Sequence, residues 1–381
     1  MAETECRYFN GYKPCVKNPV CSMQCHSYSP VDSAILVIHL GAMGSVVRST
    51  ALLRKIKDAH PNSYVVWVTE KPSHEILKFH PAIDRIFELN FDSTLSLQAF
   101  KFDTVYALDK DIRTAGLLKT LSFRQVKGFS ADPHNGGISP ADIDADELWS
   151  LGLSNEKKFF ENKKPEIQLL FETCGLEYSK DKYWLHLNFE ETAEAQRRGR
   201  LWSEDGRKLL IGINTGCGNV ITYKKMSLKS QMELIKRITD LLPDAKIVLL
   251  GGKDETELNA AMAAQWPQVV LSDTRGGVRD GLQSIAAVDC LISGDSFAMH
   301  AGIALNKFTL AWFGPTCAHE VEFYENGFAI KSELACSPCW KRDCSNQILC
   351  YDHPDIGQFI MHLQAWARPY IVSKQKQPLE L

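Results

Sequence analysis

Short apolar runs alternate with amphipathic stretches along most of the chain, a pattern typical of buried parallel strands covered by helices. In the N-terminal half, the runs predict strands at 34–40, 64–68, 85–88 and 104–107, and helices at 46–59 and 72–79. In the C-terminal half, they predict strands at 209–214, 246–250, 269–271, 290–293 and 309–313, and helices at 229–242, 256–265 and 282–287. The β-α-β order predicts an α/β fold with two Rossmann-like, doubly wound domains facing a cleft.

The pattern also divides the chain. Between residues 133 and 204 it loosens into loops and polar helices, with one expected helix at 164–174 and a linker near 188–206. We therefore predict four segments. A Cys-rich N-terminal arm (1–30) precedes an N-terminal acceptor domain (31–205). A C-terminal nucleotide-sugar-binding domain (206–353), which contains a Cys knuckle at 336–350, is followed by a C-terminal helix and tail (354–381).

Composition narrows the function classes. The 381 residues carry 43 Lys and Arg against 46 Asp and Glu, a net charge of −3, which argues against a nucleic-acid partner. The 45% hydrophobic content argues against disorder. The longest apolar runs fall far short of the roughly 20 residues of a transmembrane helix, and the N-terminus does not resemble a secretory signal. We expect a soluble, cytoplasmic protein with no transmembrane segment.

Eight of the twelve cysteines form two clusters at the ends of the chain, and in a chain without a signal such clusters favour metal over disulfides. The compact C-terminal cluster could surround one ion tetrahedrally: Cys336, Cys339, Cys344 and Cys350. The N-terminal cluster is looser, and could bind a second ion, share ligands with the tail or pack as an arm: Cys6, Cys15, Cys21 and Cys25. We predict structural zinc or iron, because four Cys ligands leave no open position, while disulfides and free thiols stay as alternatives. The Cys-rich ends could also join copies in a homo-oligomer.

Glycine-rich loops follow several predicted strands. The first, HLGAMGS at 39–45, departs from G-x-G-x-x-G, so we expect no nicotinamide or flavin cofactor, and a structural turn is its simplest interpretation. In the loop at 214–218, Thr215 and Gly216 could present donors to phosphate oxygens, and Lys224 could neutralise a diphosphate; a solvated basic loop is the alternative. Glu255 could accept hydrogen bonds from ribose hydroxyls.

The strongest local signal is SGDSFAMHAG at 293–302, followed by WFGPT at 312–316. A small polar turn that opens a helix suits a diphosphate, and it places Asp295, Ser296, Met299 and His300 at the expected donor site. The alternative for His300 is a buried histidine that packs the helix start.

Together, the HLGAMGS, NTGCGNVITYKKMS, LLGGKDE and SGDSFAMH–FGPT segments resemble the heptosyltransferase-like family nine of glycosyltransferases, in the family's order. The resemblance implies the two-domain GT-B fold and sugar transfer from a nucleotide donor, typically ADP-heptose, to a lipopolysaccharide core or, in one subgroup, to protein side chains. It also implies that Lys224 meets the diphosphate, Glu255 the ribose, and Asp295 with Ser296 the phosphates.

Two positions depart from the family pattern. Ser45 stands where the family has its proposed Asp base, and Phe297 replaces a glycine of the donor turn. A serine of ordinary pKa cannot deprotonate a hydroxyl near neutral pH, so the base must lie elsewhere. Asp109 is the preferred replacement and Asp111 the second, although both could be solvated charges that pair with neighbouring basic residues.

The replacement base most resembles the autotransporter heptosyltransferase subgroup, which modifies protein hydroxyls and carries iron bound by cysteines. We therefore predict an inverting glycosyltransferase. Because of Ser45 and Phe297, the alternative is a non-catalytic nucleotide-sugar-binding or scaffold protein of the same fold. A metal-dependent redox protein is a third interpretation, based on the cysteines alone.

Overall fold

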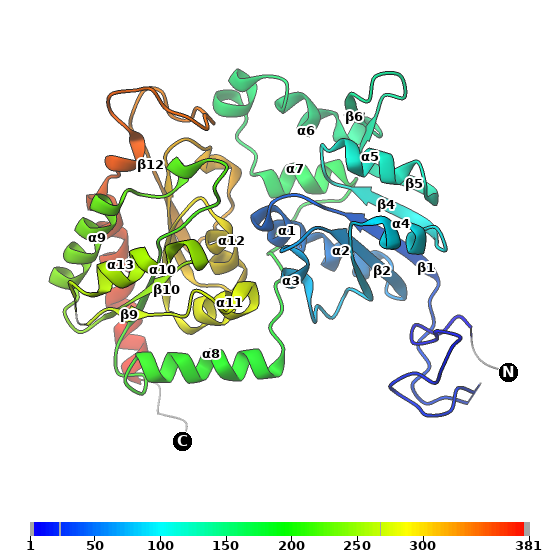
Figure 1. The fold of residues 1–381 in the computed structure, drawn as a ribbon, viewed down its shortest axis with the longest axis horizontal. Helices are drawn as coiled ribbons and strands as arrows, with labels where there is room; N and C mark the ends of the chain where they lie inside the picture. Colours follow the sequence, from blue (N-terminus) through cyan, green and yellow to red (C-terminus); the bar gives the residue numbers. More distant parts are fainter. Residues whose placement is uncertain (1–3, 23, 267, 377–381) are drawn as a thin grey trace. The chain divides into compact units, whose positions relative to one another are not determined.

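A computed structural model describes residues 4–22, 24–266 and 268–376. The chain forms two compact units, each built on its own sheet (Figure 1). The first unit comprises Met1–Lys158 and Ile167–His186, and the second comprises Phe159–Glu166 and Leu187–Leu381.

The first unit contains a six-stranded sheet in the order β3-β2-β1-β4-β5-β6, in which β6 alone is antiparallel to its neighbour. Its strands are β1 (Ser33–Ile38), β2 (Ser63–Thr69), β3 (Arg85–Glu88), β4 (Lys101–Ala107), β5 (Ser122–Ala131) and β6 (Ile138–Pro140). Its helices are α1 (Met43–Ser49), α2 (Leu52–Ala59), α3 (His74–Leu77), α4 (Phe91–Leu97), α5 (Ile112–Leu118), α6 (Asp146–Leu151) and α7 (Glu166–Thr173), with the short helix η1 (Ile143–Ala145). The short helix η2 (Lys157–Glu161) lies where the chain passes from the first unit into the second.

The second unit contains an all-parallel sheet in the order β12-β11-β10-β7-β8-β9. Its strands are β7 (Leu210–Asn214), β8 (Lys246–Leu250), β9 (Val270–Leu271), β10 (Cys290–Gly294), β11 (Phe308–Phe313) and β12 (Gly327–Lys331). Its helices are α8 (Phe189–Trp202), α9 (Leu228–Leu241), α10 (Thr256–Ala263), α11 (Gly277–Ala287), α12 (Phe297–Ala304) and α13 (Ile356–Lys376). Its short helices are η3 (Thr222–Lys224), η4 (Lys253–Glu255), η5 (Ala318–Glu320) and η6 (Cys350–Asp352).

Both sheets have the Rossmann strand order, so each has a point where the order of connection reverses. This point lies between β1 and β4 in the first unit and between β7 and β10 in the second. Ligands of open α/β sheets bind beyond the carboxyl ends of the strands at such a point. The predicted fold class, two Rossmann-like α/β domains, is therefore confirmed.

The central strands were predictable because they are buried on both faces. Residues 35–38 of β1 are at most 1% exposed, and all five residues of β7 are buried. Parallel strands covered on both faces read as continuous apolar runs. Helix α13 contributes Phe359, Leu363 and Ala367 to the core of the second unit, where they are fully buried. No helix of the described ranges is both long and apolar enough to cross a membrane.

The predicted linker near 188–206 is wrong, because α8 occupies most of it. Asn188 begins this helix with a capping box: its side chain accepts from the Glu191 N–H, and the Glu191 side chain accepts from the Asn188 N–H. Arg198 holds the helix against α11 through an ion pair with Asp280 (2.5 Å) and a hydrogen bond to Ser284 (2.8 Å). Polar side chains thus fix the helix, and the hydrophobic pattern gave no sign of it.

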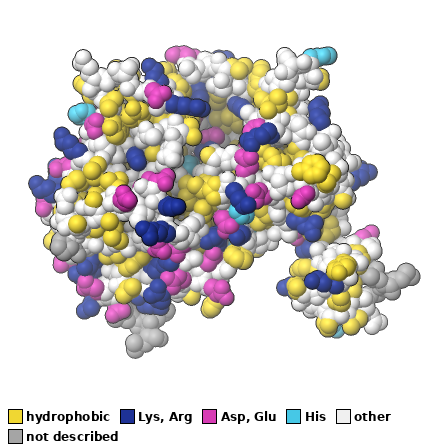
Figure 2. All heavy atoms as spheres, in the orientation of Figure 1, with side chains coloured by type: hydrophobic (Ala, Val, Ile, Leu, Met, Phe, Trp, Pro, Cys, Tyr) yellow, Lys and Arg dark blue, Asp and Glu magenta, His cyan; other side chains and the backbone are white. Residues whose placement is uncertain are grey.

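The surface carries both signs of charge. Figure 2 shows Lys and Arg side chains interspersed with Asp and Glu on the visible face of each unit. The N-terminal arm, in contrast, exposes apolar side chains, among them Tyr12 (90% exposed) and Val16 (98% exposed). An ion pair between Arg7 and Asp84 joins the arm to the body of the first unit, and a β-bridge between Cys6 and Pro30 pairs the two ends of the arm.

Candidate functional site

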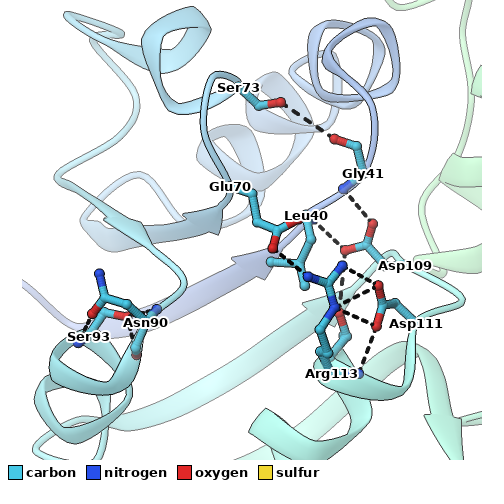
Figure 3. A network of polar contacts seen from close by, with 10 residues as sticks. Leu40, Gly41, Glu70, Ser73, Asn90, Ser93, Asp109, Asp111 and Arg113 are labelled. Atoms are coloured by element: carbon cyan, nitrogen blue, oxygen red, sulfur yellow. Dashed lines mark hydrogen bonds and ion pairs between the residues drawn. The ribbon is translucent and has the colours of Figure 1, made fainter. Parts of the chain in front are cut away.

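At the strand ends of the first unit, Asp109 bonds the loop that follows β1 (Figure 3). Its Oδ2 accepts from the Leu40 N–H (2.6 Å) and its Oδ1 accepts from the Gly41 N–H (2.8 Å). The Asp109 side chain is 8% exposed, and the His39 Nε2 lies 3.9 Å from its Oδ1. A Cβ on Gly41 would come within 3.0 Å of that oxygen, so the absence of a side chain there permits the close approach. Asp109 thus joins the ends of β1 and β4 at the reversal point.

Asp111 has a different environment, at the start of α5. It is the N-cap of that helix and accepts from the Arg113 N–H (2.8 Å), while its carboxylate pairs with the Arg113 guanidinium (2.6 Å). Arg113 also pairs with Glu70 (2.5 Å), as Figure 3 shows. Hydrogen bonds from Arg113 lower the pKa of Asp111. This carboxylate is more exposed than that of Asp109, but it is a weaker base than an ordinary aspartate.

Ser45 lies in the first half of α1, where its Oγ accepts from the Arg48 Nη2 (3.1 Å). The hydroxyl therefore has a local partner. Nothing about this contact gives it the basicity of a carboxylate, so Asp109 and Asp111 stay the predicted bases.

At the strand ends of the second unit, Asn214 joins β7 to β10. Its Nδ2 donates to the Gly216 carbonyl (2.7 Å) and lies 3.2 Å and 3.3 Å from the hydroxyl oxygens of Ser293 and Ser296. Those two hydroxyls are 2.9 Å apart. The sequence did not single out Asn214, although its place at the end of a predicted strand was a usable signal. The Asn214 side chain holds two predicted donor loops side by side.

Lys224 and Asp295 form an ion pair at this edge, with Nζ 2.8 Å from Oδ2. A Cβ on Gly294 would lie 2.1 Å from the Lys224 carbonyl oxygen, so the two chain segments pass in direct contact. Burial opposes ionisation of Asp295. The charges of Lys224 and His300, with hydrogen bonds from Lys224 and Thr316, nevertheless hold its pKa below the ordinary value. The carboxylate is thus ionised and anchors the lysine. Thr316, whose signal was the FGPT segment, was not among the predicted site residues.

Glu255 lies beneath the loop that follows β7. It is 8% exposed and its Oε2 accepts from the Gly252 N–H (2.9 Å). A Cβ on Gly216 would come within 2.3 Å of its carboxyl carbon. Thr215 is fully buried, with its hydroxyl 2.6 Å from the Asn259 Oδ1 and 3.0 Å from the Leu250 carbonyl. The hydroxyl therefore stabilises the loop through buried hydrogen bonds to Leu250 and Asn259.

The remaining predicted donor residues belong to α12. Ser296 is its N-cap, yet its hydroxyl makes no hydrogen bond to the helix start and contacts Ser293 and Asn214 instead. Met299 (0% exposed) and His300 (5% exposed) are buried within the helix. His300 nevertheless lies close enough to Asp295 for its charge to lower the pKa of that carboxylate.

The C-terminal cysteines lie around one small cavity. Cys336, Cys339, Cys344 and Cys350 line a space of about 30 Å³, and Tyr223 contributes to its wall. Burial, and then the neighbouring thiols, raise the pKa of Cys350 to about 11. Four thiols are a donor set that suits zinc or iron. The N-terminal cysteines line a larger cavity of about 350 Å³ together with Tyr8, Phe9 and Tyr12. All twelve cysteines lie in the described ranges and are free of disulfides.

A third set of possible ligands escaped the sequence reasoning. The ligand atoms of Cys317, His319 and Glu320 lie within 4.8 Å of one another, in and beside η5. Elsewhere in the described part of the chain, no three His, Cys, Asp or Glu ligand atoms lie within 4.8 Å of one another. In each Cys cluster, the thiols would therefore have to move closer together to bind an ion. The signal was the C-x-H-E spacing directly after FGPT.

Comparisons with known proteins identify the kind of molecule. No protein-family model matches the chain. The lipopolysaccharide heptosyltransferase 1 of Campylobacter coli is 23% identical over 314 residues, which cover 77% of this chain and 87% of that protein. The structure of the glycosyl transferase family 9 protein from Veillonella parvula superposes with a TM-score of 0.61 at 18% identity, covering 88% of this chain and 97% of that one. The chain is thus similar in sequence to a lipopolysaccharide heptosyltransferase, and it has the GT-B fold.

Two further structures have the same fold. The E. coli heptosyltransferase WaaC, solved with ADP, matches with a TM-score of 0.59 at 16% identity, over 86% of this chain and 99% of that one. The dodecameric iron-containing heptosyltransferase TibC, solved with ADP-D-beta-D-heptose, matches with a TM-score of 0.53 at 9% identity, over 88% and 77%. The predicted family resemblance and the glycosyltransferase class are confirmed, while a place near the autotransporter subgroup stays a prediction.

Proposed function

We propose that this heptosyltransferase homologue transfers a sugar, heptose, from an ADP-linked donor to a hydroxyl of a lipopolysaccharide-type or protein acceptor, with inversion at the anomeric carbon. The observation that carries the proposal is the cluster at the strand ends of the second unit. There an anchored lysine, a close glycine contact and the start of α12 lie together at the reversal point. The named heptosyltransferase relatives, two of them solved with ADP or ADP-heptose, support this choice of donor.

The donor groups would act on the leaving nucleotide. The Lys224 ammonium would form an ion pair with the diphosphate in addition to its pair with Asp295. The first N–H groups of α12 would donate hydrogen bonds to phosphate oxygens. This stabilises the negative charge that develops as the glycosidic bond breaks. The Glu255 carboxylate has lone pairs beyond the one that accepts from the Gly252 N–H, and with these it would accept hydrogen bonds from the ribose hydroxyls.

For the base we retain Asp109, with Asp111 second. Asp109 lies at the ends of β1 and β4, and each oxygen of its carboxylate has lone pairs beyond its bond to the loop. It would remove the proton from the acceptor hydroxyl, whose oxygen then attacks the anomeric carbon. Asp111 is less suited, because its pairing with Arg113 lowers its pKa.

The two Cys clusters would hold structural zinc or iron. Four thiolates around one ion supply a crosslink and no open position for substrate, so the metal stabilises the fold. Metal analysis of the purified chain would test this, with two equivalents expected if both clusters bind one ion. The Cys-rich ends would also join copies in a homo-oligomer, which light scattering would test.

Nucleotide titration tests the donor proposal directly. A ligand that binds only the folded state raises its stability by about 2.7 kcal/mol at a hundred times its dissociation constant. We expect ADP to raise the melting temperature more than UDP, GDP or CDP, and ADP-heptose to be consumed when acceptor is present. If the chain is instead a non-catalytic nucleotide-sugar-binding protein, ADP will bind but no turnover will appear with lipopolysaccharide or protein acceptors. If no nucleotide binds, the proposed function is wrong.

A further inference from the structure

The Cys knuckle at 336–350 contacts the proposed donor lysine through an aromatic ring. The Trp340 ring lies beside the Lys224 ammonium, with Nζ 5.2 Å from the ring centroid. Such a cation–π contact attracts the ammonium to the ring face. Trp340 directly follows Cys339, one of the four predicted metal ligands, so the knuckle carries the ring.

The backbone at Trp340 is held in an unusual conformation. Its φ of +53° lies in the left-handed region, which is unfavourable for a bulky residue. The Cys339 and Trp340 N–H groups both donate to the Pro315 carbonyl, at 2.9 Å and 2.8 Å. The indole Nε1 donates to the Cys317 sulfur (3.4 Å). These three bonds fix the ring to the segment that follows β11.

Tyr351, which directly follows the knuckle, contacts the loop that carries Lys224 at two further points. Tyr351 packs edge-on against Tyr223, with ring centroids 5.2 Å apart, and its carbonyl accepts from the Ser227 N–H (2.9 Å). Residues on both sides of the lysine are therefore anchored to Tyr351, next to Cys350 of the knuckle. The lysine ammonium itself contacts both the Trp340 ring and the Asp295 carboxylate.

We propose that Trp340 is a positioning residue that holds Lys224 at the place of the donor diphosphate, and that the Cys knuckle influences donor binding through this contact. The inference rests on the proposed function and names the link between its metal-binding segment and its donor site. The ring attracts the charged ammonium but does not occupy its N–H donors. A second carboxylate would occupy them. Lys224 thus stays close to the strand ends, and less conformational freedom is lost when a diphosphate binds.

The test is a double-mutant cycle on nucleotide affinity. Trp340→Gly removes the ring while glycine accepts the positive φ, so the knuckle backbone is not strained by the change. We expect ADP to bind roughly 2- to 30-fold more weakly, the range of one cation–π contact, with adenosine affinity unchanged because adenosine carries no phosphate. Trp340→Phe should restore most of the affinity for ADP. Lys341→Ala, an exposed neighbour in the knuckle, is the control that should change nothing.

The second arm of the cycle uses Lys224→Ala. In this background Trp340→Gly should cause no further loss of ADP affinity, because the ring then has no ammonium to hold. Equal losses with and without Lys224, or parallel losses of ADP and adenosine, would overturn the proposal in favour of a general structural effect. A failure of the proposed function looks different: the unmodified chain would then bind no ADP at all.

Discussion

Replacing Asp109 by Asn tests whether this carboxylate holds the first loop. The carboxylate accepts one backbone N–H on each oxygen, at 2.6 Å and 2.8 Å, in a side chain that is 8% exposed. Asparagine keeps one oxygen, but its NH₂ group would face the second N–H, so one bond is lost and the other becomes neutral. Hydrogen bonds to charged groups contribute about 1.5–3 kcal/mol each. We therefore expect Asp109→Asn to destabilise the first unit by about 2–4 kcal/mol.

Asp111→Asn is the matched control. Asparagine is as good an N-cap as aspartate, so the start of α5 should survive. The ion pair with Arg113 is exposed to solvent and contributes at most about 1 kcal/mol. Urea unfolding should therefore separate the two variants clearly, and hydrogen exchange should locate the cause. The amides of Leu40 and Gly41 should lose protection in Asp109→Asn and keep it in Asp111→Asn.

The same pair of variants distinguishes the two roles of Asp109. If it only holds the loop, turnover should fall together with loop protection. If it is the base, turnover should be lost even under conditions where ligand or low temperature keeps the loop folded. An Asp109→Asn variant that unfolds like the unmodified chain and keeps its loop amides protected would refute the structural reasoning. Loss of turnover in Asp111→Asn alone would move the base to Asp111.

Three further predictions concern other parts of the chain. Burial lowers the pKa of His80 to about 4, so between about pH 6.5 and 4 the unfolded chain binds the extra proton. Stability should therefore fall by up to roughly 3 kcal/mol as the pH drops through this window, and His80→Gln should flatten that part of the urea-midpoint profile. Gly216→Ala would bring its Cβ within 2.3 Å of the Glu255 carboxyl carbon and should lower the melting temperature, whereas Gly218→Ala meets no atom within 4 Å and should not. Cys339→Ser should remove one metal equivalent per chain by elemental analysis, while a serine at a cysteine outside both clusters should leave the metal content unchanged.

The sequence predicted the strands that are buried on both faces, together with the partly exposed β3 and β9, and missed β5, β6 and β12. β5 alternates apolar and polar positions and includes Arg124, Gln125 and Lys127, so it lacks the continuous apolar run of a central strand. β12 is a short strand at the sheet edge, with exposed Phe328. In both cases the partner strand, rather than the local pattern, decides the conformation. Helix α8 was missed for a related reason, because its ion pairs reach residues more than 80 positions away.

The sequence predicted that the site residues lie at the strand ends, but it did not predict which hydrogen bonds they make there. Loops after parallel strands meet at one sheet edge, which is why Lys224 and Asp295 could be expected together. That Asp109 bonds the Leu40 N–H depends on the register of β1 against β4, across 69 residues of chain. The burial of the Thr215 hydroxyl depends equally on Asn259 of α10. Local sequence carries no record of such tertiary pairings.

One polar side chain bridges the strand ends in each unit, and its chemical type sets the charge of that edge. In the first unit the bridge is the carboxylate of Asp109, which accepts from backbone N–H groups and leaves a negative charge beside the loop. In the second unit it is the amide of Asn214, which is neutral, and the nearby Lys224 ammonium pairs with Asp295. The second edge offers a diphosphate an ammonium, that of Lys224, whereas a hydroxyl that must lose a proton would favour the carboxylate at the first edge. In the proposed function, the first unit removes the proton of the acceptor and the second binds the donor diphosphate. These two roles follow from the residue type that joins the strands at each reversal point.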